Sequence, residues 1–155
     1  MKQSYILGAL AAVGLLASCS DKEDAKPAPD ATIELTATID GSQQASATAP
    51  APTPSKATGT FTGTYTKVGN VQKLTYTVTY QGLKPTQGHI HTGAPGTSGP
   101  VTIDFEDRTL AKPITTGTYT LTPEQADNLL NNRMYINIHS ADFPGGEIRG
   151  DIKKK

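Results

Sequence analysis

The stretch Gly88-His89-Ile90-His91-Thr92-Gly93 decides the fold, because it alternates ionisable residues with isoleucine. The stretches Tyr135-Ile136-Asn137-Ile138-His139 and Gly145-Gly146-Glu147-Ile148-Arg149-Gly150 show the same alternation. Successive side chains of a β-strand point to opposite faces of its sheet. The pattern therefore predicts two faces. One face should point into a core and carries Ile90, Ile136, Ile138 and Ile148. The opposite face should bring together His89, His91, Asn137, His139, Glu147 and Arg149.

The remaining sequence also divides into short strands separated by turns. Apolar residues alternate with threonine in these segments, and residues typical of turns cluster between them. Strands do not alternate with long helical patterns, which excludes a parallel α/β sheet. We therefore predict an all-β domain, an antiparallel Greek-key sandwich or barrel of about eight strands. The expected strands are 31–39, 58–67, 74–80, the segment around His89, 101–105, a strand ending at 121, 133–140 and 147–152.

A single short helix is expected to interrupt the strands. Thr122 can cap its first turn, Pro123 suits the first helical position, and Gln125 lies three residues after the cap. An apolar stripe follows, formed by Ala126, Leu129 and Leu130. This stripe predicts that the helix packs one face against the core.

The N-terminal segment has the features of a secretion signal. Lys2 precedes an uncharged apolar run, residues 5–16, that is too short to span a bilayer. The run ends in Leu16-Ala17-Ser18-Cys19, which resembles the lipobox of a bacterial lipoprotein. The resemblance implies that residues 1–18 are removed as a signal peptide, and that lipid on Cys19 anchors the protein in a membrane. The alternative is an ordinary secretory signal.

Residues 19–30 are expected to form a flexible tether, because they are polar, contain prolines and lack periodicity. The acidic run Asp21-Lys22-Glu23-Asp24 resembles surface-export signals of some diderm bacteria; the alternative is a solvated linker. We therefore expect an exported protein anchored in the cell envelope, at the outer membrane; the acidic run, if it is an export signal, would place it on the cell surface. Cys19 is the only cysteine, so the domain expected at residues 31–152 must be stabilised by its core without an internal disulfide.

The composition excludes several classes of function. The 155 residues include 14 Lys and Arg and 14 Asp and Glu, which gives a formal net charge of zero. A nucleic-acid partner is not expected, because that function requires a clustered basic face. Residues 153–155 are expected to be a solvated basic tail. No serine or cysteine of the domain lies in a nucleophile motif, and paired carboxylates are not evident, so no catalytic residue is predicted.

Several segments together resemble the CHRD domain, a module named for chordin that also occurs alone in bacterial secreted proteins. These segments are 58–59, 74–80, Leu83, 89–93, 99–101, 117–119, Leu121, 135–139 and 145–150. The resemblance covers about residues 31–152, and the last two motifs are specific. It implies a β-sandwich and an extracellular location, without a settled biochemical activity. The chain departs from the family in residues 41–55, where a longer Ala/Pro-rich loop lacks the usual glutamate, so no role is carried over to this loop.

The His-x-His strand is also similar to the copper-binding strand of copper/zinc superoxide dismutases. That resemblance implies a related eight-stranded Greek-key topology and a metal site. Those enzymes need a fourth histidine, an aspartate-bearing zinc loop and a structural disulfide, whereas this chain has three histidines and one cysteine. The resemblance therefore supports a metal site more than it supports dismutase activity.

Three interpretations of the predicted polar cluster remain open. The first is a structural network in which Glu147 and Arg149 pair with Asn137 and the histidines to fix strand register. The second is a site for one copper or zinc ion. Its ligands would be His89, His91 and His139, with Glu147 as a fourth ligand or as a group that orients an imidazole. The third is an anion or glycan site that uses Arg149 and histidine donors. The partner beyond the membrane would then be an extracellular protein or a glycan.

Overall fold

The computed structural model describes residues 28–45, 52–105 and 114–155. The predicted signal peptide, Cys19 and most of the predicted tether lie outside these described residues. The strands are β1 (Ala31–Asp40), β2 (Thr58–Val68), β3 (Val71–Gln81), β4 (Pro85–Thr92), β5 (Val101–Asp104), β6 (Ile114–Leu121), β7 (Met134–Ser140), β8 (Ile148–Asp151) and β9 (Lys153–Lys154). The helices are the 3-10 helix η1 (Gly41–Gln43) and the α-helix α1 (Pro123–Leu130). In the described part of the chain, neither helix has the length and apolar character needed to cross a membrane.

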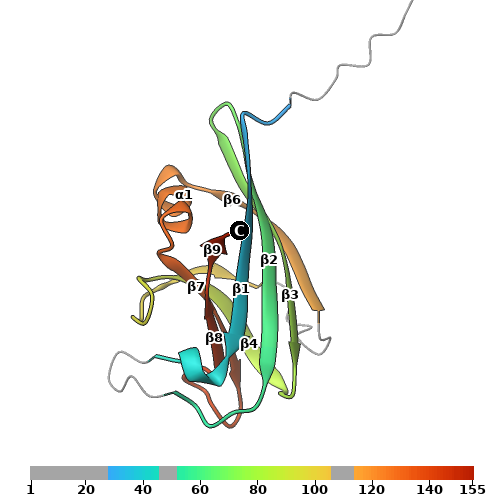
Figure 1. Cartoon of the computed structure of the whole chain (residues 1–155), viewed down its shortest axis with the longest axis vertical. Coiled ribbons are helices and arrows are strands. Elements are labelled where there is room, and N and C mark those ends of the chain that lie inside the picture. The colour runs from blue at the N-terminus through green and yellow to red at the C-terminus, as the bar shows by residue number, and fades with distance from the viewer. Residues whose placement is uncertain (1–27, 46–51, 106–113) are drawn as a thin grey trace, which may run out of the picture.

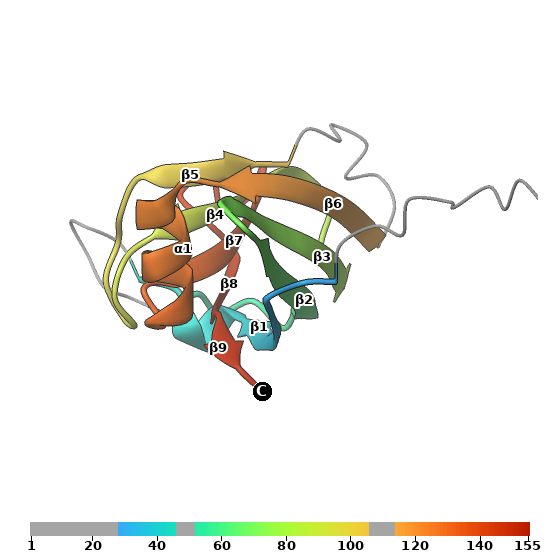
Figure 2. The same ribbon diagram turned by 90° about the horizontal axis from the view of Figure 1, so that it is seen from above.

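The strands form one antiparallel sheet that curls into a nearly closed barrel (Figures 1 and 2). The strand order is β5-β4-β7-β8-β1-β2-β3-β6, and β9 pairs with β1 beside β8. The prediction of an all-β antiparallel fold with one short α-helix is therefore confirmed. The order also places β4, β7 and β8 side by side, so the three alternating stretches are neighbours as the sequence suggested.

The core lies inside this curled sheet. The four predicted core isoleucines all have fully buried side chains, which confirms the face assignment. They pack with apolar residues from the other half of the sheet, including Leu35, Ile39, Phe61, Leu74 and Val78. If one of these strands slipped by one residue against its neighbour, its isoleucines would turn out of the core. Their burial therefore fixes the pairing register.

Threonines cover the outer face of β1, β2, β3 and β6. The pairing of these strands aligns them in rows, one of which contains Thr36, Thr62, Thr77 and Thr116. In the next row, the hydroxyls of Thr60 and Thr79 lie 2.7 Å apart and form a hydrogen bond. Threonine is β-branched and suits a strand whose outer face meets water.

The helix α1 has the predicted capping box. The Thr122 hydroxyl accepts a hydrogen bond from the backbone N–H of Gln125 at 3.2 Å, and the Gln125 side chain accepts one from the Thr122 N–H at 2.8 Å. Ala126 and Leu129 are buried in the core. The predicted helix start and packing face are therefore confirmed.

The C-terminal lysines differ from the predicted solvated tail. Their side chains are exposed, but Lys153 and Lys154 pair through their backbones with Thr36 and Leu35 of β1 as strand β9. This strand was not predicted, because it is defined by backbone pairing and two consecutive lysines show no hydrophobic alternation.

Candidate metal centre

The centre lies on the outer face of β4, β7 and β8. Strand pairing sets His89 opposite Asn137, and Asn137 opposite Arg149 on its other side. In the same way His91 is opposite Tyr135, and His139 is opposite Gln87. Because residues two apart on a strand share a face, all three histidines project from the same side of the sheet, away from the isoleucine core.

The structure brings the three predicted histidine ligands together. One candidate ligand atom from each of His89, His91 and His139 lies within 4.8 Å of the other two. The closest pair is His89 Nδ1 and His139 Nε2, which are 3.3 Å apart. Two nitrogens bound to one tetrahedral zinc ion at 2.0–2.1 Å are separated by about 3.3 Å. This pair, which shares a hydrogen bond in the metal-free protein, has that spacing, and the third nitrogen lies within 4.8 Å of both.

Backbone carbonyls fix the tautomers of two of these rings. His91 Nδ1 lies 3.0 Å from the Gly99 carbonyl oxygen, and His139 Nδ1 lies 2.9 Å from that of Pro144. A carbonyl oxygen only accepts, so each Nδ1 carries the hydrogen and each Nε2 keeps its lone pair. This is the usual support for metal-binding histidines. His91 Nε2 is buried and has no hydrogen-bond partner.

The electrostatic environment keeps two of the imidazoles neutral. Burial lowers the pKa of His89, and the nearby His139 lowers it further, while Asp104 acts in the opposite direction. Burial also lowers the pKa of His91, partly offset by the hydrogen bond to Gly99. A neutral imidazole is the form that binds a metal ion. Both rings are therefore ready to bind a metal at neutral pH without losing a proton.

Among the described residues, Asp104 supplies the carboxylate that lies within 4.0 Å of the His89 ring. Its Oδ1 lies 3.9 Å from His89 Nε2, beyond hydrogen-bond distance, and its side chain is 76% exposed. Asp104 was not among the site residues predicted from the sequence. Asp104 alternates with the buried Ile103, which places it on the outer face of β5, next to β4. This alternation is the sequence signal that could have identified it.

Arg149, on β8, holds the loop of residues 93–100, which covers this face. Its side chain is 1% exposed, and its Nη1 donates to the Thr97 carbonyl at 2.7 Å while its Nη2 donates to Asp151 at 2.9 Å. The guanidinium carbon lies 3.6 Å from the centre of the Tyr135 ring. That ring also stacks on His91, with centroids 4.8 Å apart. Tyr135, on β7, therefore lies between Arg149 on β8 and His91 on β4. Protein groups engage Nη1 and Nη2 of Arg149, whereas its buried Nε has no hydrogen-bond partner.

Glu147, the predicted fourth ligand or orienting group, lies outside the histidine group. Among the described residues, the set able to share one metal ion consists of the three histidines. The Glu147 carboxylate instead accepts a hydrogen bond from the Ser55 hydroxyl at 2.6 Å, and its carbonyl accepts one from Thr53 at 2.6 Å. Thr53 and Ser55, at the C-terminal end of the 41–55 loop, thus hold Glu147, a role that the sequence did not indicate.

Asn137 is enclosed by a tight turn. It is 5% exposed, and Gly146 approaches it with φ +119°. A β-carbon at position 146 would lie 2.6 Å from the Asn137 amide and 2.6 Å from Gln44 Nε2. Glycine is required here by both the backbone conformation and the space, so the turn before β8 is shaped to cover the polar face.

Comparison with known proteins supports one family. A search of curated proteins finds no match to this chain. The family model described as the CHRD domain matches residues 35–152. The matched range runs from β1 through β8 and includes all three histidines and the sheet face that carries them. The chain therefore belongs to the CHRD domain family.

Proposed function

We propose that this protein is a lipid-anchored binding module of the bacterial cell envelope, and that its ligand is one zinc or copper ion. The CHRD family suggests a binding or structural module. The observation that carries the proposal is the buried His91 Nε2, which has no hydrogen-bond partner and belongs to a group of three histidines. A buried lone pair without a partner costs stability, and a metal ion would satisfy it.

The donor set favours these metals over others. Imidazole nitrogens suit zinc and copper, whereas calcium and magnesium take oxygen ligands. Three protein ligands would leave a fourth position for water or an exchangeable group. A purely structural network is the second candidate, and it is favoured by the hydrogen bonds that Arg149 Nη1 and Nη2 donate to Thr97 and Asp151.

Calorimetry on the metal-stripped chain lacking residues 1–19 separates these candidates. We expect saturable binding of about one Zn(II) or Cu(II) per chain. His91→Ala and His139→Ala should each weaken binding by at least ~10-fold, because even residues that only orient a ligand usually cost that much. Thr77→Ala, on the threonine face, is the control and should bind as the parent does. Absence of saturable binding at micromolar metal would leave the structural network as the function of the cluster.

The anchor is tested separately. The motif Leu16-Ala17-Ser18-Cys19 after an uncharged apolar run supports lipidation at Cys19. The parent should partition into the detergent phase of a cell extract, and Cys19→Ala should move to the aqueous phase or stay unprocessed. Equal partitioning of the two proteins would contradict lipidation and would leave the metal proposal unaffected.

A further inference from the structure

The tautomer of His89 follows from its hydrogen bond with His139. His139 Nδ1 donates to the Pro144 carbonyl at 2.9 Å, so His139 Nε2 keeps a lone pair. This Nε2 lies 3.3 Å from His89 Nδ1. Because a neutral His139 can only accept in this contact, the hydrogen is on His89 Nδ1, and the lone pair of a neutral His89 is on Nε2. In the metal-free protein, His89 therefore has the opposite tautomer to His91 and His139.

A metal ion shared by the two rings requires this tautomer to change. The nitrogens that face each other, His89 Nδ1 and His139 Nε2, are the pair with the spacing of two ligands of one zinc ion. A metal ion binds a nitrogen lone pair, so it can bind His89 Nδ1 only after that atom has lost its hydrogen to water. The ring stays neutral by taking a hydrogen from water at Nε2. Metal binding therefore creates an Nε2–H donor on His89.

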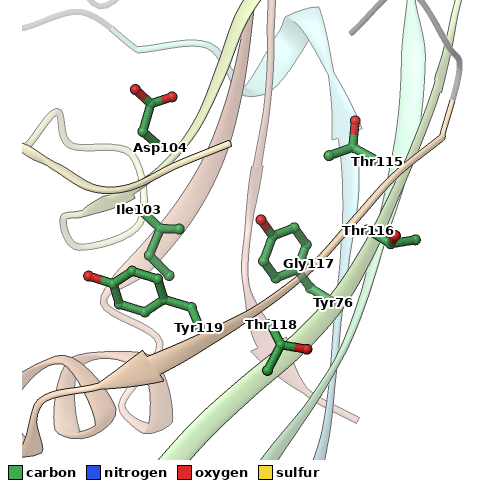
Figure 3. A pocket seen from close by; sticks show the side chains of 8 residues that line it. All are labelled: Tyr76, Ile103, Asp104, Thr115, Thr116, Gly117, Thr118 and Tyr119. Carbon is green, nitrogen blue, oxygen red and sulfur yellow. The ribbon is translucent and has the colours of Figure 1, made fainter. Parts of the chain in front are cut away.

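Asp104 lies where an acceptor for this donor is needed. Strand pairing sets Asp104 of β5 directly opposite His89 of β4, and β-carbons of directly opposite residues are about 4.5–5.5 Å apart. Figure 3 shows the Asp104 side chain leaving β5 on the side opposite to Ile103. Its carboxylate is 76% exposed, and Oδ1 lies 3.9 Å from His89 Nε2. The exposed side chain has room to rotate toward the ring.

The distance of 3.9 Å between these groups agrees with the metal-free tautomer. A carboxylate oxygen and the Nε2 lone pair are both acceptors, so they cannot form a hydrogen bond. A hydrogen on Nε2 would let the oxygen approach to about 2.7–3.2 Å. We propose that Asp104 is a positioning residue of the metal centre, which accepts a hydrogen bond from His89 Nε2 in the metal-bound protein and so holds Nδ1 toward the ion. This inference rests on the metal-binding function proposed for the three histidines.

Calorimetry of zinc binding to the metal-stripped protein tests this role. Asp104→Ala should weaken zinc binding by ~10-fold or more, as the loss of a residue that orients a metal ligand usually does. Asp104→Glu should recover most of the affinity, because it restores a carboxylate opposite His89. The loss in Asp104→Ala should persist at high salt, which screens a simple attraction between exposed charges. Glu34→Ala removes an exposed carboxylate from β1 and is the matched control, which should bind zinc as the parent does.

Nitrogen NMR of the histidine rings supplies a signature that a merely structural role would not change. The hydrogen of His89 should be on Nδ1 in the metal-free parent and on Nε2 in the zinc-bound parent. Asp104→Ala should leave the metal-free tautomer unchanged, because the contact with His139 fixes it. The melting temperature of the metal-free variant should also match that of the parent, since the side chain removed is mostly exposed.

Three results would overturn the role of Asp104. If the parent binds zinc and Asp104→Ala binds it equally well, the carboxylate does not position His89, and the metal proposal is unaffected. A zinc-bound parent with the hydrogen still on His89 Nδ1 would show that the tautomer does not change and that Asp104 receives no hydrogen bond. A parent that binds no zinc would overturn the metal-binding function itself, and the role of Asp104 with it.

Discussion

The outer surface of the barrel differs between its two halves. Over β1, β2, β3 and β6 it consists of threonine rows that are exposed or half-buried. Over β7 and β8 the outward residues are buried, and they include Tyr135, Asn137, His139 and Arg149. Both halves share the same apolar interior, so the difference arises from what covers the outside.

This comparison shows two ways to satisfy polar groups on a sheet. Water hydrates the threonine face, whereas protein loops supply the partners on the histidine face. The carbonyls of Thr97, Gly99 and Pro144 are three of those partners. Removing the partner of a buried polar group lowers the free energy of unfolding more than removing the partner of an exposed one, because water can replace only the latter. Substitutions should therefore have large effects on the histidine face and small effects on the threonine face.

The largest effect is expected at the buried cation. Arg149→Met removes a 1% exposed guanidinium and leaves Asp151 and the Thr97 carbonyl without their donor. Breaking a buried pair from one side typically costs about 3–5 kcal/mol, and denaturant melts of the two proteins would measure it. Lys153→Met removes the same charge from an exposed side chain and should stay within about 0.5 kcal/mol. Equal losses in the two variants would show that the faces do not differ.

A smaller, graded effect is expected from pH on the metal-free protein. Burial lowers the pKa of His89 and His91 below the ordinary value of 6.5. The unfolded chain therefore binds more protons than the folded chain just below pH 6.5. The two neutral imidazoles should make their full contribution to the free energy of unfolding above pH 6.5. This contribution should be lost as the pH falls through the lowered pKa values of the folded protein. Denaturant melts between neutral and mildly acidic pH would show the slope.

A His89→Gln/His91→Gln variant provides the matched control for this slope. Without the two titrating rings, the fall in stability between neutral and mildly acidic pH should become shallower. An identical pH profile in the parent and the variant would assign the acid sensitivity to other groups.

The smallest effect is expected on the threonine face. Thr60→Val removes an exposed hydroxyl that, within the described part of the chain, bonds only to its neighbour Thr79. The cost should lie within about 0.5 kcal/mol, and metal binding in calorimetry should be unchanged. A loss comparable to that of Arg149→Met would mean that the threonine rows are a structural network as important as the loops.

The sequence was sufficient for the parts of the fold that follow from strand periodicity. The alternation around Ile136 and Ile138 identifies the core face because side chains on a strand repeat every second residue. The cap at Thr122 is equally local. Sequence could not show that the opposite face is buried too, since its cover comes from loop 93–100 and from residues 41–45 and 52–55, which have no periodicity.

The composition of the histidine centre was only partly predictable. His89 and His91 share a strand, so their common face follows from their spacing. His139 joins them through the pairing of β4 with β7, which brings together residues 50 positions apart. The place of Glu147 depends on the turn before β8 and on Ser55. The shared alternation of the two stretches indicated that β4 and β7 are neighbours, whereas the contact of Ser55 with Glu147 leaves no pattern in a single sequence.

The position of β1 in the sheet has a mechanical consequence. The strand is bonded on one side to β2 and on the other to β8 and β9, and it runs along the length of the molecule (Figure 1). The chain enters this strand at Ala31, so a pull from the N-terminal side acts along the strand axis. Such a force loads the ten residue pairs between β1 and β2 in shear, all at once, instead of unzipping them one by one. A domain held by its N-terminal end would resist being pulled open by whatever it binds.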